Sequence, residues 1–188
     1  MNWSEQKIAA FMARWTFHRK CLVVVPNCSW TGHECDVLAI TRDLRVIDIE
    51  IKISVSDLRA DAAKDKWFHS WDWKIDGPYT ANMMANRRPR RWPRKVWKHY
   101  YAVPADIWSP ALAVSISRDS GVLLMHHNPA GGVFLKAWRG ARPCRDAERI
   151  AAEDAVDIAR LASLRMWDAF DNLRERISEL DHLRKELA

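Results

Sequence analysis

Two apolar, β-branched runs in the first third of the chain, at residues 35–41 and 45–53, are separated by Arg42, Asp43 and Leu44. This pattern predicts a β-hairpin with a loop of about three residues and Asp43 at its tip. Residues that face each other across the hairpin should then have numbers that add to twice 43, or 86. Side chains alternate faces along a strand, so two sets lie on opposite faces. The polar set is Glu34, Asp36, Asp48, Glu50 and Lys52, and the apolar set is Val37, Ala39, Ile47, Ile49, Ile51 and Ile53.

The predicted register brings two acidic side chains together, because Asp36 faces Glu50 while Glu34 faces Lys52. Directly opposed residues have Cβ atoms roughly 5 Å apart. Two ionised carboxylates at that range repel by about 3 kcal/mol at an effective dielectric constant of about 20. A divalent cation that bridges Asp36 and Glu50 would offset the repulsion, since hard ions such as Mg²⁺ take oxygen ligands. Lys52 would then polarise a phosphate or orient the attacking water.

A helix is predicted at residues 3–17, before the hairpin. Asn2 with Glu5 three residues later is typical of a capping box that opens a helix. Helical spacing predicts a buried stripe of Ile8, Phe11, Met12 and Trp15. Glu5 lies almost on this stripe, so it is either a cap or an acid that reaches the predicted site.

The other periodic segments predict an α/β fold. Ser54, with Asp57 three residues on, is the expected cap of a helix that runs to about residue 67. Asp61, within that helix, is expected either to pair locally or to reach the site. The predicted strands are residues 21–26, residues 99–103, and a hairpin of residues 121–125 and 133–138 around N-P-A-G-G.

The end of the chain, from residue 146 onward, is predicted to be helical. Its first apolar residues are expected to pack on the sheet, and they are Ile150, Ile158, Leu161 and Leu164. Later apolar residues recur in a four-three alternation typical of a coiled-coil seam, at Phe170, Leu173, Ile177, Leu180 and Leu187. Either homo-oligomerisation or packing back onto the same chain would cover them.

Length and composition indicate one domain with an extension. We expect the domain to span residues 1–165, with an insertion at 71–97, and the helical extension to span 166–188. No apolar run approaches the ~20 residues of a membrane span, and the first turns lack a signal-peptide pattern, so we expect a cytoplasmic protein. The four cysteines form no C-x-x-C pair. Buried free thiols are the favoured interpretation over a metal site of Cys28, His33 and Cys35.

Positive charge is concentrated in the body of the domain. Lys and Arg minus Asp and Glu give 22 − 13 = +9 for residues 1–144 and 8 − 11 = −3 for residues 145–188. Pro89 and Pro93 exclude a regular helix through the most basic segment, which predicts a loop free to contact DNA phosphates. The expected contacts are Arg87, Arg88, Arg90, Arg91, Trp92, Arg94, Lys95 and Lys98. Alternatively, the tryptophans anchor the loop and the arginines are solvated.

Asp36, followed after thirteen residues by Glu50-Ile51-Lys52, resembles the D…(D/E)xK signature of the PD-(D/E)xK nuclease superfamily. The D-V-L-A segment from Asp36, the segment I-S-V-S-D-L-R-A-D from Ile53 and Y-Y-A-V-P from Tyr100 are similar to its MmcB-like and phage-encoded branch. Cys35 replaces the proline that often precedes the aspartate, and the residues of the insertion do not map onto the family. The resemblance covers roughly residues 23–104.

The resemblance implies a restriction-endonuclease-like core, with a central mixed sheet flanked by helices, that hydrolyses DNA phosphodiesters in DNA repair or phage DNA metabolism. It implies that Asp36, Glu50 and the Ile51 carbonyl hold Mg²⁺ or Mn²⁺, with Lys52 as a catalytic residue and Glu5 as an accessory acid. Two alternatives stay open. One is a non-catalytic DNA-binding module of the same fold, and the other is an oligomeric assembly protein.

Overall fold

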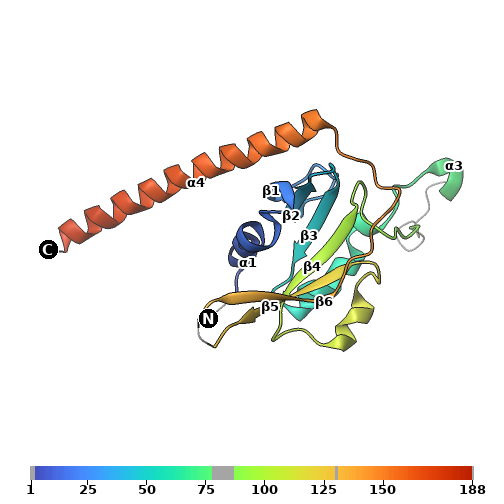
Figure 1. The fold of residues 1–188 in the computed structure, drawn as a ribbon, viewed down its shortest axis with the longest axis horizontal. Helices are drawn as coiled ribbons and strands as arrows, with labels where there is room; N and C mark the ends of the chain where they lie inside the picture. The colour runs from blue at the N-terminus through green and yellow to red at the C-terminus, as the bar shows by residue number, and fades with distance from the viewer. Residues whose placement is uncertain (1–2, 78–86, 130, 188) are drawn as a thin grey trace.

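A six-stranded mixed sheet forms the centre of the protein in a computed structural model that describes residues 3–77, 87–129 and 131–187 (Figure 1). Strand order follows the chain, and the β3–β4 and β4–β5 pairs are parallel whereas the other pairs are antiparallel. The strands are β1 (Cys21–Cys28), β2 (Cys35–Thr41), β3 (Val46–Ile51), β4 (Lys98–Pro104), β5 (Gly121–His127) and β6 (Val133–Arg139). The predicted α/β class and mixed sheet are confirmed.

The hairpin of β2 and β3 has the predicted register. Val37 pairs with Ile49 and Ile40 pairs with Val46, so each pair of numbers adds to 86. The apolar set packs against the N-terminal helix, with the exception of Ile53, which is 39% exposed because β3 ends two residues earlier. The expected pairing of Glu34 with Lys52 is wrong, because both residues lie outside the strands.

Helix α1 (Glu5–Phe11) and a π-helical turn (Met12–Phe17) cover one face of the sheet. Ser4 caps α1 by accepting a hydrogen bond from the Lys7 backbone N–H at 3.3 Å, so the helix begins two residues after the predicted start at about residue 3. Asn2, the predicted cap, lies outside the described residues. The wider π turn changes which side chains face the sheet. Phe17 is therefore buried, whereas Trp15, predicted to be buried, is 71% exposed.

On the opposite face, α2 (Val55–Ala60) begins at the predicted cap, where the Asp57 N–H donates to Ser54 Oγ at 3.2 Å. The helix ends earlier than predicted, and two 3-10 turns follow, Asp61–Ala63 and Asp65–Trp67. Lys64 between them has extended backbone, with φ −66° and ψ 147°. The break allows both Asp61 and Lys66 to turn inward, which one continuous helix would prevent. The shorter helices are α3 (Trp73–Asp76) and the 3-10 helix Pro110–Ser115.

Two hydrophobic clusters cover this second face. The first packs Leu38 and Ile40 of β2 under Ile158, and the second packs Tyr101 of β4 with Leu58 of α2. Between them, β3 and β4 present polar side chains, including Asp48, Glu50 and His99, that are almost completely buried. The middle of this face is therefore polar.

Helix α4 (Ala152–Glu186) begins six residues later than predicted and leaves the body of the domain (Figure 1). Its first turns pack Ala155 and Ile158 on the sheet, but Leu164, also expected there, is 51% exposed. The helix continues without interruption across the expected boundary at residue 165. The predicted seam does not pack back onto its own chain, since Phe170, Leu173, Ile177, Leu180 and Leu187 are at least 51% exposed. Within the described ranges, none of the helices combines the length and apolar character of a membrane span.

Candidate active site

The polar centre of the second face is a network of buried charges. Lys52 donates a hydrogen bond to Oε2 of Glu50 at 2.7 Å, and Nζ of Lys66 lies 2.8 Å from the other oxygen, Oε1. Nζ of Lys52 and Nζ of Lys66 also lie 3.5 Å and 3.3 Å from the carboxylate of Asp61. We call Glu50, Lys52, Asp61 and Lys66 the charge cluster. Burying charges is costly unless they are paired, and here each charge has a partner.

Asp61 is the most constrained member of the charge cluster. It accepts hydrogen bonds from the Tyr101 hydroxyl at 2.6 Å and from the Trp67 indole at 3.1 Å. Burial opposes ionisation of Asp61, but the charge of Lys66 and the Tyr101 hydrogen bond outweigh burial and lower its pKa. Asp61 therefore stays an anion in the protein interior. Asp61 does both things that were expected as alternatives, because it pairs locally with Lys64 at 3.1 Å and also lies 3.5 Å from Lys52.

Asp36 lies at the edge of the charge cluster, where β2 begins. Its Oδ2 accepts a hydrogen bond from the Ile51 backbone N–H at 2.7 Å and lies 3.8 Å from Nζ of Lys52. The side chain is 26% exposed. Burial and the nearby charge of Glu50 raise the pKa of Asp36 to about 6. The charge of Lys52 and the Ile51 N–H do not fully offset these two effects.

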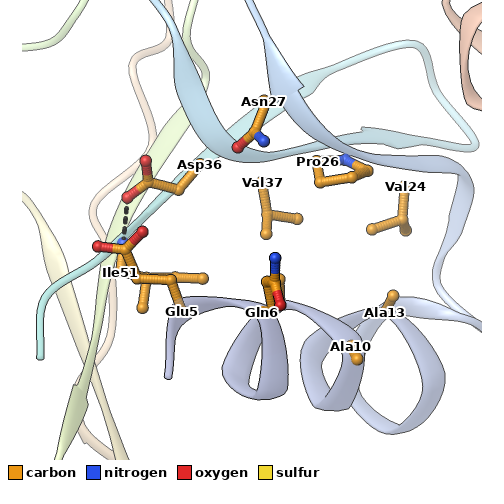
Figure 2. A pocket seen from close by; sticks show the side chains of 11 residues that line it. Glu5, Gln6, Ala10, Ala13, Val24, Pro26, Asn27, Asp36, Val37 and Ile51 are labelled. Carbon is orange, nitrogen blue, oxygen red and sulfur yellow. Dashed lines mark hydrogen bonds between the residues drawn. The ribbon is translucent and has the colours of Figure 1, made fainter. Parts of the chain in front are cut away.

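A pocket of about 440 Å³ opens beside Asp36, between α1 and strands β1 to β3. Figure 2 shows Glu5 and Asp36 pointing toward the same end of this pocket, next to Ile51. The negative charge of Glu5 contributes to the raised pKa of Asp36, as expected for two neighbouring carboxylates. Ser4, and not Glu5, supplies the side-chain cap of the helix. Glu5 is thus free to face the pocket.

The structure brings together the residues predicted for catalysis: Asp36, Glu50, Ile51 and Lys52 at the end of β3, with Glu5 facing Asp36. The prediction that a cation must relieve the repulsion of Glu50 is incomplete, because Lys52 and Lys66 occupy both of its carboxylate oxygens. Lys66 was missed, since the predicted continuous helix did not assign it clearly to one face. The apolar Trp67 that follows Lys66 in the sequence is the local signal that could have indicated a buried position for Lys66.

The donor set near Asp36 fits a hard divalent cation. Glu5, Asp36 and the Ile51 carbonyl offer oxygen, which Mg²⁺ and Mn²⁺ prefer. Four acids lie within 4 Å of the ammonium groups of three lysines and Glu5 adds a fifth acid, so the formal charge of this set is 3 − 5 = −2. The acids are Glu5, Asp36, Glu50, Asp57 and Asp61, and the lysines are Lys52, Lys64 and Lys66. Each oxygen of Glu50 already faces one ammonium group, so an ion would compete with Lys52 and Lys66 for this carboxylate.

The basic loop at residues 87–98 is less free than predicted. Arg87 pairs with Asp65, Arg88 with Asp76, and Arg91 with Asp119, so these three charges are already neutralised. The Trp92 indole donates to the Arg142 carbonyl at 3.1 Å and anchors the loop, as the alternative interpretation proposed. The ammonium groups of Lys95 and Lys98 lie over the rings of Trp30 and Trp97.

Part of the basic loop runs beside the segment that carries Lys66. The Arg90 N–H donates to the Trp67 carbonyl at 2.6 Å, and the His69 N–H donates to the Arg88 carbonyl at 2.9 Å. A groove of about 390 Å³ is lined by Arg90, Arg91, Trp92, Arg94 and Lys95 together with acidic residues of the 140s. Arg90 and Arg94 lack an ion pair among the described residues, so they are the arginines of the groove available to an anion.

The fold and the site define an α/β protein with a six-stranded mixed sheet and a buried charge cluster at the end of β3. No protein-family model and no curated protein matches the chain. The chain is similar to a solved structure, the SPO1766 protein of unknown function from Silicibacter pomeroyi, with 17% identity and a TM-score of 0.52 over 94% of this chain and 95% of that chain. This likeness shows a shared fold alone, and the restriction-endonuclease-like character of the core stays a prediction.

Proposed function

We propose that this protein is a metal-dependent nuclease that hydrolyses DNA phosphodiester bonds. The observation that carries the proposal is the convergence of Asp36 and Glu50, from two facing strands, on the same lysine, Lys52. The open pocket beside Asp36 provides access for a substrate, and the basic groove near Arg94 provides positive charge for a polyanion.

The roles follow from the position of each group. Asp36, Glu5, the Ile51 carbonyl and Glu50 would hold Mg²⁺ or Mn²⁺, which lowers the pKa of a bound water and stabilises charge on the phosphate. Lys52 lies between Asp36 and Glu50, where it can orient a nucleophile or neutralise a phosphate oxygen. Asp61, held by Tyr101 and Trp67, keeps the ammonium of Lys52 in position.

Cleavage assays on single-stranded, double-stranded and branched DNA with Mg²⁺ or Mn²⁺ test the proposal. Asp36→Asn and Lys52→Met should abolish cleavage and leave DNA binding nearly unchanged, because neither residue lies in the basic groove. Asp43→Asn is the matched control, since Asp43 lies on the same hairpin but at its exposed tip. Undiminished cleavage by either site variant would refute the mechanism.

A second candidate function, a DNA-binding module that does not hydrolyse DNA, is supported by the two ion pairs of Glu50. If Lys52 and Lys66 never release its oxygens, the site lacks one metal ligand. Binding without cleavage of all three DNA substrates would favour the module. An absence of DNA binding at low salt would instead favour an assembly protein that oligomerises through α4.

A further inference from the structure

A second group of donor atoms lies beside the charge cluster, where the start of β2 approaches β3 and β4. Nε2 of His33 is 3.0 Å from Oδ2 of Asp48 and 3.8 Å from Sγ of Cys35. The ligand atoms of these three residues all lie within 4.8 Å of one another. Nε2 of His99 lies 3.9 Å from Oδ2 of Asp48. Among the described residues, Asp48, and not Cys28, joins His33 and Cys35 in this group.

Hydrogen bonds orient both histidines toward Asp48. Nδ1 of His33 lies 3.2 Å from Oγ1 of Thr31, which donates its own proton to the His33 carbonyl at 2.8 Å and so accepts from the ring. Nδ1 of His99 lies 2.9 Å from Oγ of Ser120. With each Nδ1 engaged by a hydroxyl, each Nε2 is directed at the carboxylate. Metal-binding histidines are held in this way by an outer partner.

Two buried polar atoms of this group have no hydrogen-bond partner among the described residues. They are Oδ1 of Asp48 and Nε2 of His99, on side chains that are 0% and 1% exposed. A buried polar atom without a partner is costly and calls for an explanation such as an ion. Both histidines approach Oδ2 of Asp48, so a cation between them would bind this oxygen and give Nε2 of His99 a partner.

We propose that His33, Cys35 and Asp48 bind zinc, and that His99, which is not part of this compact group but lies 3.9 Å from Asp48, closes on the ion as the fourth ligand. Imidazole, thiolate and carboxylate are all ligands that Zn²⁺ accepts, whereas Mg²⁺ and Ca²⁺ avoid sulfur. The Cys35 thiol loses its proton to solvent as the sulfur binds the ion. Because side chains of the protein supply all four ligands, the site is structural and leaves no position for a substrate.

The zinc site differs from the nuclease site in chemistry and in purpose. It ties the loop before β2 to β3 and β4, the strands that carry Glu50 and Tyr101. The pocket beside Asp36 instead presents only oxygen donors to an ion. Zinc would therefore hold the strands beneath the charge cluster and take no part in hydrolysis.

Cobalt(II) titration of the metal-free full-length chain, kept reduced, tests the proposal. We expect one Co²⁺ per chain with a sulfur-to-cobalt charge-transfer band and the intense visible bands of four-coordinate cobalt, all lost when Zn²⁺ is added. Cys35→Ser should remove the charge-transfer band and weaken Zn²⁺ binding more than about 100-fold, since loss of even an outer partner costs up to about 100-fold. Cys28→Ser is the matched control, because Cys28 is also a buried free cysteine and lies opposite Cys35 in the register of β1 and β2. It should bind like the wild type.

Three results would overturn the zinc site: no binding of Co²⁺ or Zn²⁺, binding that Cys35→Ser leaves unchanged, or displacement of Co²⁺ by millimolar Mg²⁺. If Cys35→Ser does not fold by circular dichroism, His33→Gln replaces it, because His33 is partly exposed and tolerates change better. Asp36→Asn should retain the cobalt spectrum. Each readout is metal binding, so the zinc site and the nuclease proposal fail independently.

Discussion

Replacing Lys66 by Met isolates the electrostatic contribution of the charge cluster, because methionine keeps most of the aliphatic stem and removes the charge. The Lys66 side chain is 2% exposed, and its Nζ lies 2.8 Å from Glu50 and 3.3 Å from Asp61. Breaking a buried ion pair by removing one partner costs about 3–5 kcal/mol. At roughly 2–4 °C per kcal/mol for a domain of this size, the melting temperature should fall by about 6–20 °C.

Lys64→Met is the matched control within the same cluster. Lys64 contacts the same two carboxylates, at 3.6 Å and 3.1 Å, but its side chain is 47% exposed. Exposed pairs contribute about 0–1 kcal/mol, so the control should lose at most about 4 °C. Urea and thermal unfolding at pH 7.5 in a chelator measure both variants. Equal losses for Lys66→Met and Lys64→Met would refute the conclusion that burial makes Lys66 decisive.

The Lys66→Met variant also tests how Glu50 becomes available to a metal. Adding Glu50→Gln to Lys66→Met should recover part of the stability, because the buried Lys52 then faces one buried acid, Asp61, instead of two. Without the second change, Oε1 of Glu50 has lost its cation, and Mg²⁺ or Mn²⁺ should raise the melting temperature of Lys66→Met more than that of the wild type. Equal metal-induced shifts would show that Lys66 does not compete with the ion.

Three further predictions concern pH, DNA and assembly. In the folded protein the pKa of Asp36 is about 6, above the usual 3.8, so the free energy of unfolding falls as pH rises through this window. Without metal, urea unfolding should therefore find Asp36→Asn more stable than the wild type by up to about 3 kcal/mol at pH 7.5, and by less at pH 5. Arg94→Ala should reduce the slope of log affinity for DNA against log salt concentration by about 0.9, and an unchanged slope would remove Arg94 from the interface. Arg91→Ala, which breaks the ion pair with Asp119, should mainly lower stability. If α4 associates through its seam, light scattering should find an oligomer that Leu173→Asp converts to a monomer, and a monomeric wild type would contradict this.

Several site contacts could be predicted because short-range rules govern them. The two-residue period and the short turn determine the register of β2 and β3, so Asp36, Glu50 and Lys52 could be assigned to one end of the hairpin. The Ser54 cap is equally local, because it joins residues three positions apart. The basic segment could be identified, but not its neutralisation, since Arg88 and Arg91 find partners 12 and 28 residues away.

The sequence by itself determined the alternation of β2 and β3, the meeting of acids with Lys52 and the polar character of one strand face. Only the tertiary structure decided that β4 lies parallel to β3, which brings His99 beside Asp48 and Tyr101 beside Asp61. It also decided that α2 ends at Ala60 and that the two 3-10 turns on either side of Lys64 leave Lys66 buried. These outcomes depend on pairing buried charges between distant segments, and local periodicity carries no information about such partners.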